Sequence, residues 1–85
     1  MAGGYELIVF TISLPDLDAV LKARDFKPYE LDLSDQYAFD KRVTLLADGY
    51  QIDPVYAYKT GDEGNFLILL TNKTKDKALL YRFRG

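Results

Sequence analysis

The sequence predicts an α+β domain in which one helix packs on a twisted, mostly antiparallel β-sheet. The composition, with 48% hydrophobic and 28% charged residues, is that of a folded globular chain. One segment has helical spacing, and several short apolar segments are separated by Gly-, Asn- and Asp-rich turns. We expect a strand and a helix followed by an antiparallel meander of four or five strands, as an open sheet or a partial barrel. Residues 1–85 are too few for a second core, so we expect a single domain.

The first expected element is a strand over residues 5–14. The segment is rich in β-branched and aromatic residues, which favour strands. Alternate positions point to opposite faces, and both faces are apolar: Ile8, Phe10, Ile12 and Leu14 on one, and Tyr5, Leu7 and Val9 on the other. A strand that is apolar on both faces is expected in the interior of a sheet.

The expected helix follows directly. Ser13 is a good cap residue with Asp16 three positions on, and Pro15 falls in the first turn, where its missing N–H costs nothing. The buried stripe is expected to comprise Leu14, Leu17, Val20, Leu21 and Phe26. The helix should end before Pro28.

Residues 36–47 fit two structures. A helix would place Phe39, Val43, Leu46 and Ala47 on one stripe, with Gly49 as its C-cap. A strand would place Tyr37, Phe39, Val43 and Leu45 on one face and make Asp48-Gly49 a hairpin turn. We predict the strand, because Tyr, Phe, Val and Thr favour a pleated surface.

The last third of the chain predicts three strands. The first lies near residues 50–60, where Pro54 implies a bulge or an edge position and Tyr50, Tyr56 and Tyr58 share a face. Residues 65–71 are apolar on both faces and are expected at the centre of the sheet, and residues 78–84 are expected to have one wet face. Turns are expected at 61–64 and 72–77.

The composition predicts a protein that is not an enzyme and that holds no metal or cofactor. The chain has no Cys and no His, and so lacks a thiol nucleophile, the usual general base and the commonest metal ligand. Patterns for phosphate loops, dinucleotide sites and calcium loops are missing as well. The apolar run 7–12 is too short to span a bilayer, so we expect a cytoplasmic protein that does not bind membranes.

The segment 30–40 suggests how the protein binds a partner. It holds four acids and no base, with apolar residues at alternate positions, so acids and apolar groups would face opposite ways if extended. We predict a small, soluble protein-binding module of the inhibitor or adaptor type, with an acidic, tyrosine-rich contact surface. The predicted contact residues are Glu30, Asp32, Asp35, Tyr37, Asp40, Tyr56 and Tyr58. The same pattern also suits an ordinary strand whose acids point into water.

Two alternative functions remain. Residues 1–63 carry twelve acids and six bases, whereas residues 64–85 carry one acid and five bases. This basic C-terminal hairpin could bind nucleic acid through Lys73, Lys75, Lys77, Arg82 and Arg84. We place a protein partner first because the chain as a whole is acidic, with a pI of about 4.9, and its field would repel phosphate. In the second alternative, the chain is a subunit of a homo-oligomer whose neighbours cover its two-sided apolar strands.

Overall fold

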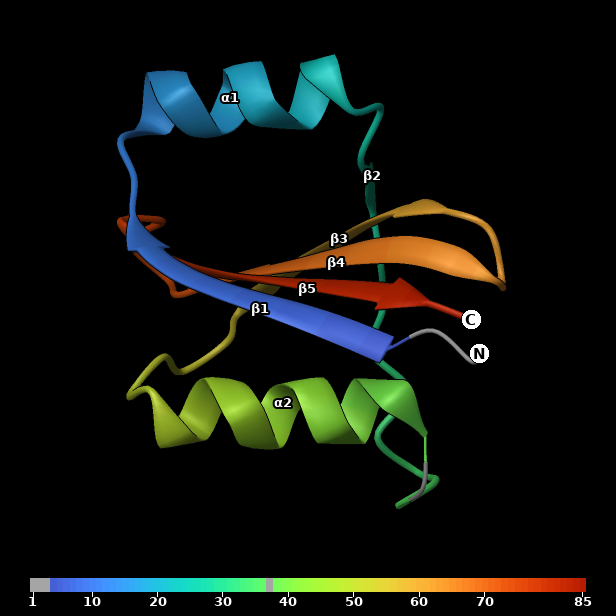
Figure 1. Cartoon of the computed structure of the whole chain (residues 1–85). Coiled ribbons are helices and arrows are strands. Elements are labelled where there is room, and N and C mark those ends of the chain that lie inside the picture. Colours follow the sequence, from blue (N-terminus) through green and yellow to red (C-terminus); the bar gives the residue numbers. More distant parts are fainter. Residues whose placement is uncertain (1–3, 37) are drawn as a thin grey trace.

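A five-stranded antiparallel sheet lies between two helices (Figure 1). The computed structural model describes residues 4–36 and 38–85. Its elements are, in chain order, β1 (Gly4–Thr11), α1 (Leu14–Ala23), β2 (Lys27–Pro28), α2 (Phe39–Gly49), β3 (Tyr56–Gly61), β4 (Asn65–Thr71) and β5 (Lys77–Arg84). The predicted α+β class and antiparallel sheet are confirmed, with a second helix added. Neither helix in the described part of the chain has the length and apolar character needed to cross a membrane.

The sheet has the strand order β1-β5-β4-β3-β2, with every pair of neighbours antiparallel. β3, β4 and β5 form a meander of three strands instead of the expected four or five, because residues 39–49 form a helix; the two-sided apolar strand β4 lies at the centre of the sheet as predicted. β1 pairs with β5 on the side away from β4, and the two-residue strand β2 pairs with β3 on the side away from β4. The sheet is therefore open, with β1 and β2 as its edges.

The expectation that residues 5–14 form an interior strand is wrong. β1 pairs on one side only, from Gly4 opposite Arg84 to Thr11 opposite Lys77. Its side chains Ile8 and Val9, on opposite faces, are 53% and 39% exposed. The error has a physical reason: a pattern of apolar side chains reports on the two faces of a strand, not on whether a second strand pairs with its backbone.

α1 forms as predicted. The Ser13 hydroxyl accepts a hydrogen bond from the Asp16 N–H at 3.4 Å, and Pro15 lies in the first turn. The helix ends at Ala23, before Pro28. Leu17 is buried against the sheet, but Leu14 is exposed, contrary to the expected stripe, because it is the first residue of the helix and lies a turn before the contact.

The strand predicted over residues 36–47 is wrong, and the helical alternative is the observed structure. Val43 and Ala47, four residues apart, are fully buried, whereas Leu45 is 62% exposed. This burial pattern matches a helix and excludes a strand, because Leu45 would lie between Val43 and Ala47 on the same strand face and be buried with them. Asp48-Gly49 ends α2 instead of turning a hairpin, and Tyr50 is its C-cap. Tyr50 therefore does not share a strand face with the tyrosines of β3.

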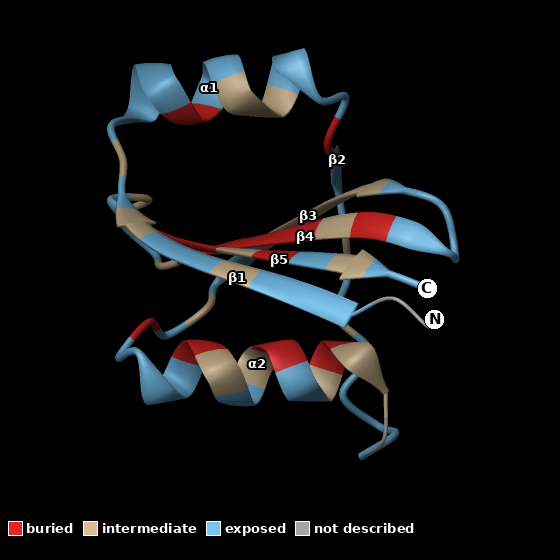
Figure 2. Cartoon of the chain, viewed as in Figure 1, coloured by how far each residue is buried: buried red, intermediate tan, exposed pale blue. Residues whose placement is uncertain are grey.

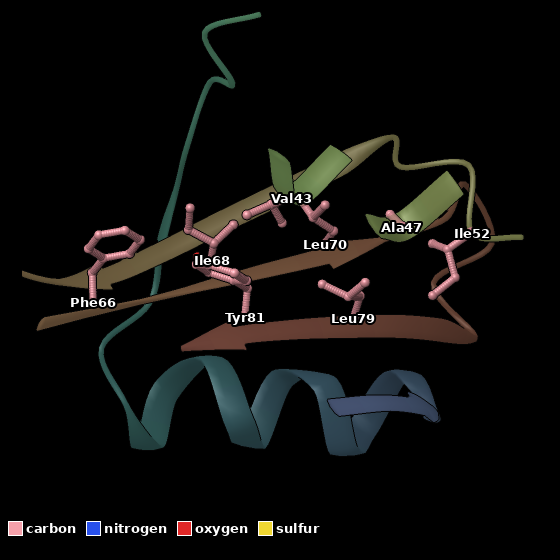
Figure 3. Close-up of a cluster of buried hydrophobic side chains, with 8 residues drawn as sticks. All are labelled: Val43, Ala47, Ile52, Phe66, Ile68, Leu70, Leu79 and Tyr81. Carbon is pink, nitrogen blue, oxygen red and sulfur yellow. The ribbon is translucent and has the colours of Figure 1, made fainter. Parts of the chain in front are cut away.

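Two apolar clusters occupy the two faces of the sheet. The larger one lies between the sheet and α2 and comprises Val43, Ala47, Ile52, Phe66, Ile68, Leu70, Leu79 and Tyr81 (Figure 3). The smaller one lies on the α1 face and comprises Leu17, Phe26, Leu69 and Ala78. α2 is buried along its sheet-facing side, whereas most of α1 is exposed (Figure 2). The stability of the fold therefore rests mainly on the α2 face.

The β3–β4 turn needs glycine at position 61. Gly61 has a φ of +103°, in a region that favours glycine, and a Cβ atom there would overlap the backbone of Asn65 and Phe66. The Asp62 carboxylate accepts hydrogen bonds from the Gly64 and Asn65 N–H groups. The predicted turn at 61–64 is thus confirmed.

Replacing Tyr81 by Phe is expected to raise the free energy of unfolding by about 1 kcal/mol, because an unsatisfied hydroxyl leaves the core. Tyr81 is fully buried, and its hydroxyl has no hydrogen-bond partner among the described residues. Urea denaturation would measure the change, with the half-buried Tyr58→Phe as the matched control. A less stable Tyr81→Phe variant would show that the hydroxyl is hydrogen-bonded in solution.

Candidate protein-binding groove

An open groove of about 710 Å³ lies at the β2–β3 edge of the sheet. We call it the tyrosine groove, and it is lined by Pro28, Tyr29, Glu30, Leu31, Val55, Tyr56, Ala57, Tyr58 and Lys75. Val55 and Tyr56 are 51% and 40% exposed. Two adjacent large side chains thus present apolar surface at a concave site, where an aromatic or aliphatic group of a partner can bury area.

The groove forms where the chain leaves β2. β2 pairs with β3 through Lys27 and Pro28, and the Tyr29 N–H makes one more bond, to the Ala57 carbonyl at 2.9 Å. Beyond this point the chain is no longer a strand, and residues 29–31 and 55–57 line the two sides of the groove. Pro28 lies opposite Tyr58, and its missing N–H costs the pairing nothing because the N position of this residue faces away from β3, whereas that of Tyr29 faces toward it.

A buried carboxylate holds in place the segment that follows β2 and lines one side of the groove. Asp40, in the first turn of α2, is 6% exposed. It accepts hydrogen bonds from the Tyr29 hydroxyl and from the Asp32 N–H, both at 2.7 Å. The Lys59 ammonium lies 4.9 Å from the centroid of the Tyr29 ring. Asp40 therefore joins α2 to the 29–32 segment and holds Tyr29 in place.

Lys75 also lines the groove. Its ammonium lies 4.3 Å from the centroid of the Tyr56 ring, a cation–π contact. The predicted turn at 72–77 that carries it is confirmed and is held by hydrogen bonds among Asn72, Thr74 and Asp76. The Asn72 and Thr74 side chains lower the pKa of Asp76, with Thr74 the larger cause. This hydrogen-bonded turn carries Lys75, whose ammonium lies over the Tyr56 ring.

The described members of the predicted contact set divide into three groups. Glu30, Tyr56 and Tyr58 all line the tyrosine groove. Asp32 and Asp35 are exposed outside it, where the Asp32 carboxylate accepts two hydrogen bonds from Ser34, which lower its pKa. Asp40 is buried and serves the fold, so the expectation of a row of surface acids fails at this position because the segment enters a helix there.

One predicted contact residue cannot be compared with the structure, and three residues that line the groove were not predicted. Tyr37 lies outside the described residues. Tyr29, Leu31 and Val55 line the groove but were not among the predicted contacts. Their signal was weak: the prolines at 28 and 54 lie next to the two points at which strand pairing stops, and only the tertiary structure brings these points together.

Tyr29 makes the stability of the groove dependent on pH. Burial, and then the hydrogen bond to Asp40, raise the pKa of Tyr29 from 10.0 to about 12. Because the folded pKa lies above the unfolded one, this contribution to stability is complete below pH 10 and is lost as the pH rises toward 12. We expect the Tyr29→Phe variant to lose less stability than the wild type across this window in chemical denaturation. The exposed Tyr50→Phe should match the wild type; equal losses in all three proteins would contradict the prediction.

The residues of the nucleic-acid alternative do not form one surface. Lys73 and Lys75 lie in the turn before β5, whereas Arg82 and Arg84 lie at its other end. β5 spans roughly 23 Å at about 3.3 Å per residue, and this separates the two groups. Arg84 also pairs with Glu6 at 3.5 Å, and Lys75 contacts Tyr56. The described structure therefore gives these five cations no common groove, and nucleic-acid binding stays an untested prediction.

A second hollow lies under α1. This cleft, of about 390 Å³, has an apolar lining from Ile8, Phe10, Val20, Ala23, Phe26, Leu67 and Leu80, with Glu6, Arg24 and Arg82 also lining it. It lies between the C-terminal half of α1 and the strands β1, β4 and β5. The feature of the sequence that could have indicated this cleft is the apolar character of both faces of residues 5–14.

Comparisons with known proteins add no relationship. No protein-family model, no curated protein sequence and no solved structure matches this chain. Across residues 4–36 and 38–85, no group of three or more Asp or Glu side chains is placed to hold a metal ion. The tyrosine groove is the candidate site because it is a concave site that three of the predicted contact residues line, namely Glu30, Tyr56 and Tyr58.

Proposed function

We propose that this protein is a non-enzymatic protein-binding module, of the inhibitor or adaptor type, that holds a segment of a partner protein in the tyrosine groove. The observation that carries the proposal is the pair of exposed side chains Val55 and Tyr56 in a concave site of about 710 Å³. A few residues carry most of the binding energy in protein interfaces, and tyrosine is among the residue types that are enriched in this role. The cytoplasmic location belongs to the same proposal, since the chain has no Cys for extracellular disulfides.

Charge at the groove supports an extended, polar partner segment. Glu30 and Lys75 both line the groove and carry opposite charges, so a partner with one cation and one anion, suitably spaced, would pair with both. Such rim charges contribute more to association rate and register than to affinity. The apolar anchor between them would supply the affinity.

The test compares two exposed tyrosines. Immobilised wild-type protein, Tyr56→Ala and Tyr50→Ala are each exposed to a cell lysate, and the retained proteins are identified. Tyr50 is 54% exposed at the end of α2, outside the groove, so Tyr50→Ala controls for the loss of one exposed ring. We expect a protein retained by the wild type and by Tyr50→Ala to be lost with Tyr56→Ala. The proposal fails if the three retained sets are the same or if nothing is retained.

A further inference from the structure

The outer side of β1 is an unpaired strand edge. No other described strand pairs with it, and the Ile12 N–H, which donates to the Asp76 carbonyl at 2.9 Å, shows which residues bond to the β5 side. In an antiparallel pair, alternate residues bond to the neighbouring strand. The even-numbered residues of β1 therefore face β5. The N–H and C=O groups that point outward belong to Tyr5, Leu7, Val9 and Thr11.

The two edges of the sheet differ in how they are protected. β2 has only two residues, Lys27 and Pro28. Lys27 carries a charge and Pro28 lacks an N–H, and both features discourage the addition of a further strand. β1 has eight residues in regular register with β5, and none of them is Lys or Pro. Its one charged residue, Glu6, pairs with Arg84 of the same chain. Only the β1 edge is open to a further strand.

The side chains of β1 are large and apolar on both faces, as is typical of a strand in the interior of a sheet. Ile8 and Val9 are large and apolar, on opposite faces, and both are exposed, as is Tyr5 at 56%. Figure 2 shows β1 exposed along most of its length. Long, apolar edges of this kind are rare in isolated proteins because they bind other strands. A neighbouring strand would convert the edge into the interior strand that its sequence predicts.

We propose that the occupant of this edge is β1 of a second copy of this chain, paired antiparallel about a two-fold axis at Ile8. Outward-facing residues must pair with outward-facing residues, so Leu7 lies opposite Val9 of the second copy, and Tyr5 opposite Thr11. These pairs give about eight inter-chain hydrogen bonds, against roughly ten in a typical protein interface. The two sheets become one continuous sheet.

Charge selects this register. An axis at Leu7 would place the two Glu6 residues only two positions apart along the strands, at roughly 7 Å. The axis at Ile8 places them four positions apart, at roughly 14 Å, which is beyond the ~10 Å screening length at 0.1 M salt. It also adds the outward groups of Thr11 to the pairing. The interface lies at the opposite edge from the tyrosine groove, so the two proposals are independent.

Disulfide cross-linking tests the register directly, because the chain has no other Cys. Across the axis, the two Ile8 positions form a non-hydrogen-bonded pair with Cα atoms roughly 4.5 Å apart, within the range that a disulfide bridges. We expect Ile8→Cys to form a covalent dimer at least about tenfold faster than Leu45→Cys, whose position on α2 is 62% exposed. Equal rates would overturn the proposal, and faster cross-linking of Leu7→Cys would overturn the register.

Sedimentation at several concentrations tests the dimer in the unmodified chain. We expect wild-type protein to reach twice the monomer mass, and Val9→Pro to raise the dimer dissociation constant about tenfold or more, because the lost N–H points outward. Val9→Lys keeps every N–H and should weaken the dimer by placing a charge at the edge; it serves if the proline variant does not fold. A wild-type monomer at every concentration, or folded variants that dimerise as well as the wild type, would overturn the proposal.

Discussion

Replacing Asp40 by Ala is expected to lower the free energy of unfolding by about 3 kcal/mol or more. The Asp40 carboxylate is buried and accepts two hydrogen bonds, each of which is worth about 1.5–3 kcal/mol when one partner is charged. Its removal leaves the Tyr29 hydroxyl and the Asp32 N–H without an acceptor. It also removes a favourable negative charge from the first turn of α2. Thermal unfolding should show a fall in Tm of roughly 12 °C or more for a domain of this size.

Two variants control this prediction. Asp48→Ala removes an exposed carboxylate from the last turn of the same helix, and should change the stability by less than about 0.5 kcal/mol. Asp40→Asn keeps one acceptor oxygen without the charge, and should fall between the two. An Asp40→Ala variant as stable as Asp48→Ala would contradict the role assigned to this carboxylate.

The elements defined by local signals could be predicted from the sequence. α1 has a cap, a proline in its first turn and apolar residues three and four apart, and each of these acts within a few residues. β4 and β5 are short, largely apolar segments that lie between well-marked turns. These signals need no knowledge of the rest of the chain, and the structure confirms all three elements.

α2 and the position of β1 could not be predicted in this way. Phe39 and Val43 lie four apart, so they satisfy both a helical stripe and one face of a strand. The helix predicts that Leu46 faces the sheet, and the strand predicts that Leu45 is on the apolar face. Both residues are leucines, so the sequence does not distinguish the two structures, and the fold buries more of Leu46. The number of neighbours beside β1 likewise depends on strand order, which side-chain patterns do not report.

The candidate site was predicted in part for the same reason. Glu30, Tyr56 and Tyr58 were identified from charge and from tyrosine content, which are properties of the sequence. Their meeting depends on the short pairing of β2 with β3, and two-residue strands leave no periodic pattern. Asp40 could not be distinguished from its acidic neighbours because its burial follows from the helix that it begins.

Replacing Leu17 by Ala is expected to lower the free energy of unfolding by about 3 kcal/mol, within the range measured for buried leucines. Leu17 is 2% exposed and is the only buried residue of α1, so the contact of the helix with the sheet depends mainly on it. Leu14→Ala, in the same helix at a 58% exposed position, should change stability by less than about 0.5 kcal/mol.

Hydrogen exchange separates two ways in which the Leu17→Ala variant could lose stability. If α1 is held chiefly by Leu17, its amides should exchange faster in the variant than those of α2, because the helix detaches before the sheet unfolds. Uniformly faster exchange in both helices would indicate that α1 and the sheet unfold together. A variant as stable as Leu14→Ala would contradict the packing of α1 on the sheet, because deleting a truly buried leucine side chain leaves a cavity that the fold cannot fill without cost.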